Sequence, residues 1–524
     1  MMKLALLPTG TSRKRVLIVN CYFDDMRLPV GRRTKIPQAM GPVYLAGAFS
    51  PHTCDIRLYS EMYSGPLEDE KLLSWPDMLV LTGLSNSFDR MLHLTAYART
   101  KNRHVIVVAG GPAVRALPTL ARRHFDLVCT GDVEELIPVA EETFGKEAGN
   151  PSMQPRYDLA YWMGPYGYVE SSRYCNFRCS FCSLTGENRN YRKYDLDFVR
   201  RQITTLGKGR QTIIFIDNNF YGNDRSYFLA RMELIRELRQ EGYIRNWSAL
   251  VTNDFFHNDE NLLLAKEAGC IALFSGVESF DRGWLRKQRK NQNTGMGQVE
   301  MIRKCTEHGI LFLYGLMLDV ARRRVSDLRR EIEFILGSHQ ISLPSYLSIV
   351  TPFPGTPHFY DCLAEKRILP NTRLRDLDTT TLSLAPLDAV QEATRFIFEI
   401  QTLRGYKGKV LRHGLGFFRE YRSALTVFQM AVALGNSAMV ALQKTPNRSL
   451  HLSFLQSRNR ARTHVSTTEP LDRMYTPAFR VDSRFESYFR PTFLTDGEGY
   501  LSAPVEEDLL GAGVRRISKV EAAL

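Results

Sequence analysis

The sequence predicts an α/β protein of three parts: a doubly wound domain, a partial (β/α) barrel and a mostly helical C-terminal region. Short apolar runs alternate with helical stretches over roughly the first 385 residues, as in successive βα units. Polar or glycine-rich turns follow most of these runs, and beyond Pro386 the strand pattern gives way to helical stretches. A chain of 524 residues is long enough for about three domains.

We expect the domain boundaries where composition changes. A stretch rich in proline and glycine separates the first two domains and is predicted to be a linker. The expected limits are 1–150 for the first domain, 151–166 for the linker, 167–385 for the barrel and 386–524 for the C-terminal region.

The first domain is predicted to be Rossmann-like. Its expected parallel strands are 15–20, 54–59, 78–83, 104–112 and 127–132, with a helix at 41–49. Ligands of such open sheets bind beyond the carboxyl ends of the strands. Three turns fall there: Gly83-Leu84-Ser85, Gly110-Gly111-Pro112 and Thr130-Gly131-Asp132.

The central domain is predicted to be a partial TIM-type barrel. Its expected strands are 168–172, 212–219, 247–253, 271–279, 311–319 and 346–352, with helices at 198–206 and 226–241. Barrel chemistry lies at the carboxyl ends of the strands. The polar residues found there are Asp217, Asn218, Asn219, Thr252, Asn253, Glu278 and Asp319. A carboxylate there can instead cap a helix or lie in a solvated loop; Asp217 and Glu278 are the stronger site candidates, because each ends an apolar run.

Three closely spaced cysteines, Cys175, Cys179 and Cys182, follow the first strand of the barrel. Three thiolates leave one iron of a cubane iron–sulfur cluster without a protein ligand, and a small molecule can bind there. Two other interpretations are a structural zinc site and three unrelated thiols. Structural zinc normally takes four protein ligands, and no His or Cys follows at a finger-like distance.

The remaining cysteines and the N-terminal residues bear on the cellular compartment. Cys270, Cys305 and Cys362 are isolated in the sequence, and we expect buried structural thiols. The start, Met1 to Gly10, is too short for a secretory signal. Nine cysteines without such a leader favour a reducing compartment, so we expect a cytoplasmic protein.

The C-terminal region is basic and contains a long uncharged stretch. Between Arg404 and Arg462 there are eleven Lys and Arg residues and one acid, Glu420, within a net charge of +13. Residues 423–442 carry no charge; the length could span a bilayer, but the polar content favours a buried or interface helix. The basic flanks support a second hypothesis, association with an anionic membrane surface.

The cysteine spacing, with Phe181 just before the third cysteine, resembles the signature of the radical S-adenosylmethionine (SAM) superfamily. The resemblance implies a 4Fe–4S cluster on Cys175, Cys179 and Cys182, with SAM bound to the open iron. It also implies an external electron donor such as flavodoxin or ferredoxin. Reductive cleavage of SAM would then give a deoxyadenosyl radical that abstracts a substrate hydrogen.

The first domain resembles the cobalamin-binding domain that precedes the barrel in one radical SAM subfamily. The matching pieces are a Gly-Pro-x-Tyr-Leu-Ala helix and the Gly-Leu-Ser, Gly-Gly-Pro and Gly-Asp-x-Glu turns. The resemblance implies cobalamin contacts at Ser85, Gly110, Gly111 and Gly131. The Asp-x-His-x-x-Gly motif that supplies a cobalt ligand in many cobalamin proteins is missing from the sequence.

The barrel carries further pieces similar to this subfamily. Asp217-Asn218-Asn219 stands where many radical SAM enzymes have a Gly-Gly-Glu-like motif, and Gly276-Val277-Glu278-Ser279 is similar to a Gly-Ile-Glu-Ser segment. A Pro-Gly-Thr-Pro turn at 354–357 also matches. The implied SAM-side contacts are Asp217, Asn218, Thr252, Gly276 and Glu278.

The favoured function is therefore methylation of an unactivated carbon of a biosynthetic small molecule, with methylcobalamin as the methyl donor. An alternative with the same parts ends in oxidation or ring formation on a hydrophobic substrate such as a tetrapyrrole or lipid. An alternative of another class is a non-catalytic protein that binds metal or nucleic acid. The sequence contains no recognisable RNA-binding module, so no nucleic-acid partner is expected, and no motif identifies the substrate.

Overall fold

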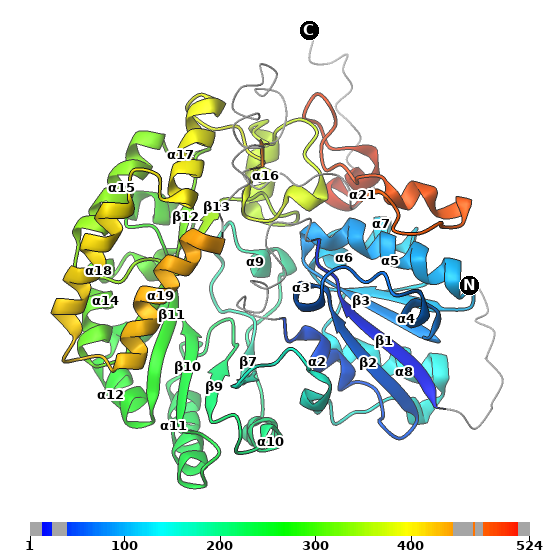
Figure 1. Cartoon of the computed structure of the whole chain (residues 1–524), viewed down its shortest axis with the longest axis horizontal. Coiled ribbons are helices and arrows are strands. Elements are labelled where there is room, and N and C mark those ends of the chain that lie inside the picture. The colour runs from blue at the N-terminus through cyan, green and yellow to red at the C-terminus, as the bar shows by residue number, and fades with distance from the viewer. Residues whose placement is uncertain (1–12, 24–38, 444–464, 467–474, 512–524) are drawn as a thin grey trace.

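The structure, a computed structural model, describes residues 13–23, 39–443, 465–466 and 475–511 (Figure 1). Its first domain is a parallel five-stranded sheet with strand order β2-β1-β3-β4-β5. The strands are β1 (Lys14–Asn20), β2 (Cys54–Ser60), β3 (Met78–Thr82), β4 (Ile106–Gly110) and β5 (Leu127–Cys129). The predicted doubly wound α/β domain is confirmed, with strand ends within a few residues of the expected ones.

The strand order reverses between β1 and β3, because β2 lies on one side of β1 and β3 to β5 lie on the other. Open α/β sheets bind ligands in the crevice beyond such a reversal. The chain leaves β1 there with the Cys21 amide donating to the Thr82 carbonyl at 2.7 Å. The connecting helices are α2 (Gly41–Ala46), α3 (Glu61–Ser64), α4 (Glu70–Ser74), α5 (Phe88–Lys101), α6 (Pro112–Ala116), α7 (Pro118–Arg122) and α8 (Leu136–Phe144).

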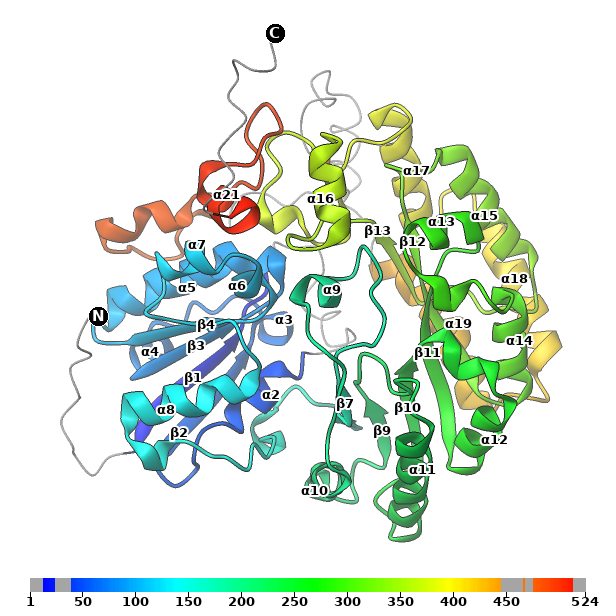
Figure 2. The same ribbon diagram turned by 180° about the vertical axis from the view of Figure 1, so that it is seen from behind.

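The central domain is an open sheet of six parallel strands in the order β13-β12-β11-β10-β9-β6. This confirms the partial barrel. The strands are β6 (Tyr166–Val169), β9 (Thr212–Phe215), β10 (Asn246–Val251), β11 (Cys270–Glu278), β12 (Leu311–Leu318) and β13 (Tyr346–Ile349). Figure 2 shows helices along the outer face, among them α10 (Leu196–Leu206), α11 (Arg225–Gln240), α12 (Asp259–Glu267), α14 (Gln298–Glu307) and α15 (Val325–Gly337).

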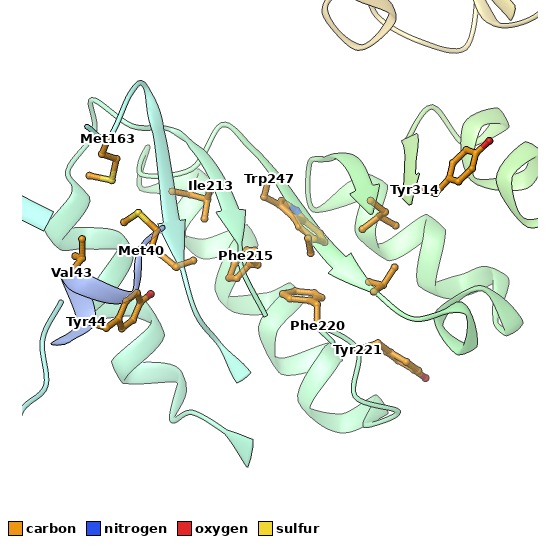
Figure 3. Close-up of a cluster of buried hydrophobic side chains, with 14 of the residues drawn as sticks. Met40, Val43, Tyr44, Met163, Ile213, Phe215, Phe220, Tyr221, Trp247 and Tyr314 are labelled. Atoms are coloured by element: carbon orange, nitrogen blue, oxygen red, sulfur yellow. The ribbon is translucent and has the colours of Figure 1, made fainter. Parts of the chain in front are cut away.

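Hydrophobic core clusters span both domains. Figure 3 shows Val43 and Tyr44 of α2 close to Met163 of the segment predicted as a linker, with Phe215 and Trp247 of the barrel beyond them. The Tyr44 hydroxyl also donates to the Gln202 side chain of α10 at 2.8 Å. The linker is therefore packed between the domains, and the edges of their sheets are held in one arrangement.

The C-terminal region first adds helices to the barrel and then returns to the first domain. Its helices are α17 (Val390–Thr402), α18 (Lys407–Tyr421) and α19 (Val427–Gln443). Residues 475–511, which carry α21 (Ala503–Leu510), pack against α5. The Tyr475 hydroxyl donates to Asp89 at 2.7 Å, and the Ala478 amide donates to the Tyr97 hydroxyl at 2.8 Å.

The uncharged stretch 423–442 is largely α19, which packs by Met430 and Ala433 on the barrel, as an interface helix should. Of the helices that the structure describes, none combines the length and the apolar character needed to cross a bilayer.

Candidate active site

The three cysteines lie on a loop at the carboxyl edge of the barrel, where it meets the first domain. The loop runs from β7 (Ser172–Arg173) to α9 (Ser183–Glu187), which Figures 1 and 2 show between the two sheets. Cys182 caps α9, and its carbonyl accepts the Thr185 amide at 2.9 Å. Cys179 is buried, while Cys175 and Cys182 are half-buried. The three sequence-predicted ligands thus lie on one loop, which ends at the N-terminus of α9.

The surroundings of the thiols fit a cluster bound through thiolates. Burial raises the pKa of Cys182 to about 11 and also raises the pKa of Cys175. Donors already point at sulfur: the Phe177 amide lies 3.5 Å from Cys175 Sγ, and the Gln292 amide nitrogen lies 3.4 Å from Cys179 Sγ. Such hydrogen bonds are among the features that tune cluster potentials.

A cubane held by three cysteines takes one thiolate on each of three irons, so its ligands surround the cluster rather than converge on one ion. Across the described ranges, no group of three or more His, Cys, Asp or Glu side chains converges as a single-ion site.

Each residue of the Asp217-Asn218-Asn219 segment at the end of β9 is hydrogen-bonded to the cysteine loop or to the residues just before it. The Asp217 carboxylate accepts from the Ser171 hydroxyl at 2.7 Å. The Asn218 side-chain oxygen accepts the Tyr174 amide at 3.1 Å, and the Asn219 amide group donates to Asn176 at 2.7 Å.

Asp217 is fully buried and lies 3.8 Å from the Arg231 guanidinium, and burial is the main cause of its raised pKa. Its oxygens are occupied by serines, so the geometry supports a role in positioning the loop. Direct SAM contact by Asp217 stays a prediction.

The opposite side of the loop is held by Ser180. Its amide donates to the Gln288 carbonyl at 3.0 Å, and its hydroxyl donates to the Gln288 side chain at 2.6 Å. The Ser180 carbonyl accepts the His358 amide at 3.0 Å, which ties the loop to the Pro-Gly-Thr-Pro turn. A Cβ on Gly186 would lie 2.9 Å from the backbone of Gly355 in that turn, so only glycine allows this approach.

Glu278, at the end of β11, forms an ion pair with Lys290 at 2.9 Å. Glu278 has a φ of +62°, a left-handed conformation that is unusual for a non-glycine residue and frequent at functional sites. A Cβ on Gly276 would lie 2.2 Å from Glu278 Oε1, so glycine at this position leaves room for the carboxylate. Burial would lower the pKa of Lys290, but the Glu278 carboxylate and nearby thiols raise it above its usual value.

The end of β10 adds Thr252, Asn253 and a residue not predicted from the sequence, Asp254. The Thr252 hydroxyl donates to Asp254 Oδ1, whereas the buried Asp254 Oδ2 has no hydrogen-bond partner in the described structure. Burial raises the pKa of Asp254. An unpaired buried carboxylate oxygen is costly unless a ligand donates to it. Asp254 directly follows Thr252 and Asn253 in the sequence, and this position at the end of a predicted strand could have identified it as a candidate site residue.

Two other polar candidates support the framework. Asn253 accepts the Ser275 hydroxyl at 2.7 Å and donates to Gln298 at 2.9 Å. Asp319 is buried and accepts the Trp284 indole at 2.8 Å and the Arg322 amide at 3.1 Å.

The glycine turns of the first domain form the opposing edge. Gly111 has a φ of +93°, and a Cβ there would lie 3.0 Å from the Gly83 carbonyl and from the Thr82 hydroxyl. Ser85 begins a short 3₁₀ turn, and its hydroxyl makes no hydrogen bond within the described ranges. A sheet edge formed by backbone atoms and small side chains can approach a large flat ligand closely.

Gly131 lies at the contact between the two edges. Its carbonyl accepts from Arg115 at 2.6 Å and its amide donates to Glu135 at 2.5 Å, so its own domain already occupies its backbone. Cobalamin contact by Gly131 therefore stays a prediction.

A network of charged and polar side chains joins the two edges directly. The Tyr174 hydroxyl, beside Cys175, donates to Asp132. Arg115 donates to Glu187 of α9 at 2.6 Å. Arg173 pairs with Glu134 at 3.2 Å, in a set that also includes Asp132, Glu170 and Arg192. No sequence pattern identified these pairs, since their partners are far apart in the chain.

Comparison with protein families identifies the class. Residues 169–322 match the model described as the Radical SAM superfamily. The matched range contains the cysteine loop and the strands β9 to β12, so this part of the chain is a radical SAM domain, and the protein is an enzyme. The family uses a 4Fe–4S cluster and SAM, which agrees with the cysteine loop, and the alternative of a non-catalytic binding protein is set aside.

Two curated relatives are methyltransferases by name. The chain is 28% identical over 200 residues to a bacteriochlorophyllide d C-12(1)-methyltransferase of Chlorobaculum tepidum, covering 36% of this chain and 41% of the relative. It is 24% identical over 333 residues to the hopanoid C-2 methylase of Rhodopseudomonas palustris, covering 59% of this chain and 61% of the relative. The chain thus spans less than two thirds of the length of either relative.

Two solved structures share the fold. The cobalamin-dependent SAM radical enzyme OxsB with aqua-cobalamin bound has a TM-score of 0.53 at 13% identity, covering 84% of this chain and 81% of that one. The radical SAM methyltransferase TsrM from Kitasatospora setae has a TM-score of 0.51 at 13% identity, covering 84% of this chain and all (100%) of that one.

Proposed function

We propose that the protein is a cobalamin-dependent radical SAM methylase that methylates an unactivated carbon. The observation that carries the proposal is that the carboxyl edges of the two sheets face each other. The edge of the partial barrel carries the three-cysteine loop, and the edge of the doubly wound sheet carries the glycine turns. The fold shared with OxsB and the names of the methyltransferase relatives support it.

In this proposal Cys175, Cys179 and Cys182 hold the cluster. The SAM-side contacts are Asn218, Thr252, Gly276 and Glu278, with Asp217 positioning the loop. Cobalamin lies against Ser85, Gly110, Gly111 and Gly131. When bound, these cofactors supply reductive SAM cleavage and a transferable methyl group.

The chain's own residues orient these groups and exclude water. The side chains of β9 and Ser180 fix the loop from two sides. The Glu278–Lys290 pair presents a carboxylate for an ammonium group and an ammonium for a carboxylate, the two charged groups of an amino acid. The buried Trp284 stacks with Phe181 at 6.2 Å between ring centroids and covers the loop from outside.

The substrate is proposed to be a small hydrophobic molecule. A Cβ added to Gly315 of β12 would lie 3.6 Å from the Phe274 ring, 3.8 Å from Tyr346 and 4.0 Å from Glu278. Phe274 and Tyr346, whose rings are 5.8 Å apart, therefore line the same inner face as the SAM-side carboxylate. Tetrapyrrole and hopanoid methylases among the relatives agree with such a wall.

The external electron donor is proposed to be an acidic carrier such as a flavodoxin or ferredoxin. Behind the cysteine loop, α13 (Arg282–Lys287) exposes Arg282, Arg286 and Lys287. An open groove of about 570 Å³ begins beside the buried Trp284. Its lining has more cations than acids: Lys287, Arg322, Arg323, Arg324 and Arg367 against Asp281, Asp327 and Glu365. Positive charge at the outer side of the loop suits an acidic partner.

We further propose a cytoplasmic enzyme that works at the membrane surface, where hydrophobic substrates partition.

The test is an anaerobic reaction with SAM carrying a labelled methyl group, a chemical reductant, cobalamin and an extract of apolar metabolites. The proposal expects 5′-deoxyadenosine and an apolar product that carries the label on carbon. Deoxyadenosine with an unlabelled oxidised or cyclised product would support the alternative and overturn methylation.

A further inference from the structure

The two helices α18 and α19 expose an unusual number of apolar side chains. On α18, Leu411, Leu415 and Phe418 are 67%, 52% and 44% exposed. Their spacing places them along one side of the helix. Phe417 and Tyr421 lie on the side that is buried against the barrel.

The exposed face of α19 is apolar throughout its described part. Val427 and Phe428 are 88% and 51% exposed, and Ala431 and Leu434 are exposed one and two turns later. A Cβ on Gly414 of α18 would lie 3.4 Å from Leu434, so the two faces adjoin. Figure 1 shows both helices on the same flank of the barrel. We define the hairpin surface as Leu411, Leu415, Phe418, Val427, Phe428, Ala431 and Leu434.

Positive charge borders this surface. The exposed cations on and beside α18 are Lys407, Lys409, Arg412, Arg419 and Arg422, with Glu420 as the one acid between 404 and 422. Five further cations of the basic segment, between Lys444 and Arg462, lie outside the described residues. Apolar side chains beside cations match a lipid surface with acyl chains below anionic headgroups.

The hairpin also adjoins the proposed substrate wall. The buried side of α18 and α19 packs on Leu311, Leu313 and Ala272, near the starts of β12 and β11. Side chains two residues apart on a strand lie on the same face. Leu313 and Ala272 are therefore followed, on the same inner face, by Gly315 and Phe274, which border the aromatic wall.

We propose that the hairpin surface docks on an anionic lipid bilayer, so that the inner face of the barrel lies next to substrate dissolved in the lipid. An exposed apolar cluster of this kind is uncommon on a protein that meets only water. The hydrophobic substrate rests on the proposed function, whereas the lipid contact depends on no cofactor.

The test is cosedimentation of the full chain, without cofactors, with vesicles of phosphatidylcholine containing phosphatidylglycerol. We expect binding that weakens about tenfold or more in pure phosphatidylcholine or at high salt. The double variant Leu411→Ser/Leu415→Ser should also bind about tenfold more weakly or worse.

The matched control is Leu229→Ser/Leu263→Ser, whose leucines are 42% and 51% exposed on α11 and α12. It should bind like the parent, and circular dichroism should show both variants folded. Absence of binding to the anionic vesicles, or an equal loss in the control, would overturn the proposal. The parent protein could instead form a dimer, fail to bind vesicles and become a monomer in the Leu411→Ser/Leu415→Ser variant. That result would overturn lipid docking and assign the surface to a second copy of the chain.

Failure of this inference and of the proposed function are separable. The Cys179→Ala variant should keep vesicle binding, because Cys179 is not one of the residues of the hairpin surface. Methyl transfer without vesicle binding would contradict only the proposal that the hairpin surface docks on lipid. Vesicle binding without methyl transfer would contradict only the proposed methylase activity.

Discussion

The two sheets meet at their carboxyl edges, and these edges differ in what they present. The edge of the first domain consists of turns with small residues, Gly83, Ser85, Gly110 and Gly111, so backbone is its main surface. The barrel edge presents thiols, amides and the Glu278–Lys290 ion pair on a loop anchored from two sides. The first suits a large ligand bound by shape and backbone contacts, and the second suits a ligand held by charge and metal bonds.

This difference implies that the two edges can be disabled separately, despite the network that joins them. The largest expected effect concerns the barrel edge. Cys179→Ala removes one of three cluster ligands, and we expect loss of essentially all cluster iron. Cobalamin affinity should change less than about twofold, as measured by the absorbance of cobalamin retained after gel filtration. Joint loss of iron and cobalamin in a folded variant would show that the edges form one site.

Asp217→Asn tests the anchoring of the cysteine loop. The change removes the charge that faces the buried Arg231, and breaking such a pair costs about 3–5 kcal/mol. Thermal unfolding of the cofactor-free protein would measure the loss. The control is Asp77→Asn, which weakens the partly exposed pair with Arg15 and should cost about 1 kcal/mol or less. Equal losses in both variants would refute the anchoring role.

Gly111→Ala tests the backbone edge. The added Cβ would lie 3.0 Å from the Gly83 carbonyl in a turn with a φ of +93°, so the turn must shift. We expect cobalamin binding to weaken about tenfold, or about 1.4 kcal/mol, with iron content unchanged. Gly145→Ala is the control, since it has a φ of +101° but nothing within 4 Å of the new atom. A similar weakening in the control would assign the effect to general strain.

A smaller effect of pH is expected at Asp224, the N-cap residue of α11, which pairs with Lys193. The Lys193 ammonium and the Tyr227 amide lower the pKa of Asp224 to about 2. Because the folded pKa lies below the unfolded value of 3.8, this contribution is present above pH 4 and is lost as the pH falls toward 2. Asp224→Asn should therefore lower the melting temperature slightly at pH 6 and leave it unchanged near pH 2. An undiminished difference at pH 2 would contradict this origin.

The sequence was sufficient for features with a local cause. The apolar runs located all eleven expected strands, and the cysteines lie within eight residues, so one loop brings them together. The sequence was insufficient for contacts that depend on packing between residues far apart in the chain. Lys290 follows a helix rather than a strand, and the partners Tyr174 and Asp132 are 42 residues apart. The same limit applies to residues 475–511, because no sequence pattern predicted that they pack on α5 across the molecule.

The central claim is that one chain carries two cofactor centres. It is tested most directly by the iron and cobalt content of the full chain, purified anaerobically from cells supplied with cobalamin. We predict about four irons and one cobalt per chain, with iron but not cobalt lost in Cys179→Ala. Iron without cobalt would contradict the cobalamin-dependent function, and zinc in place of iron would contradict the radical SAM site itself.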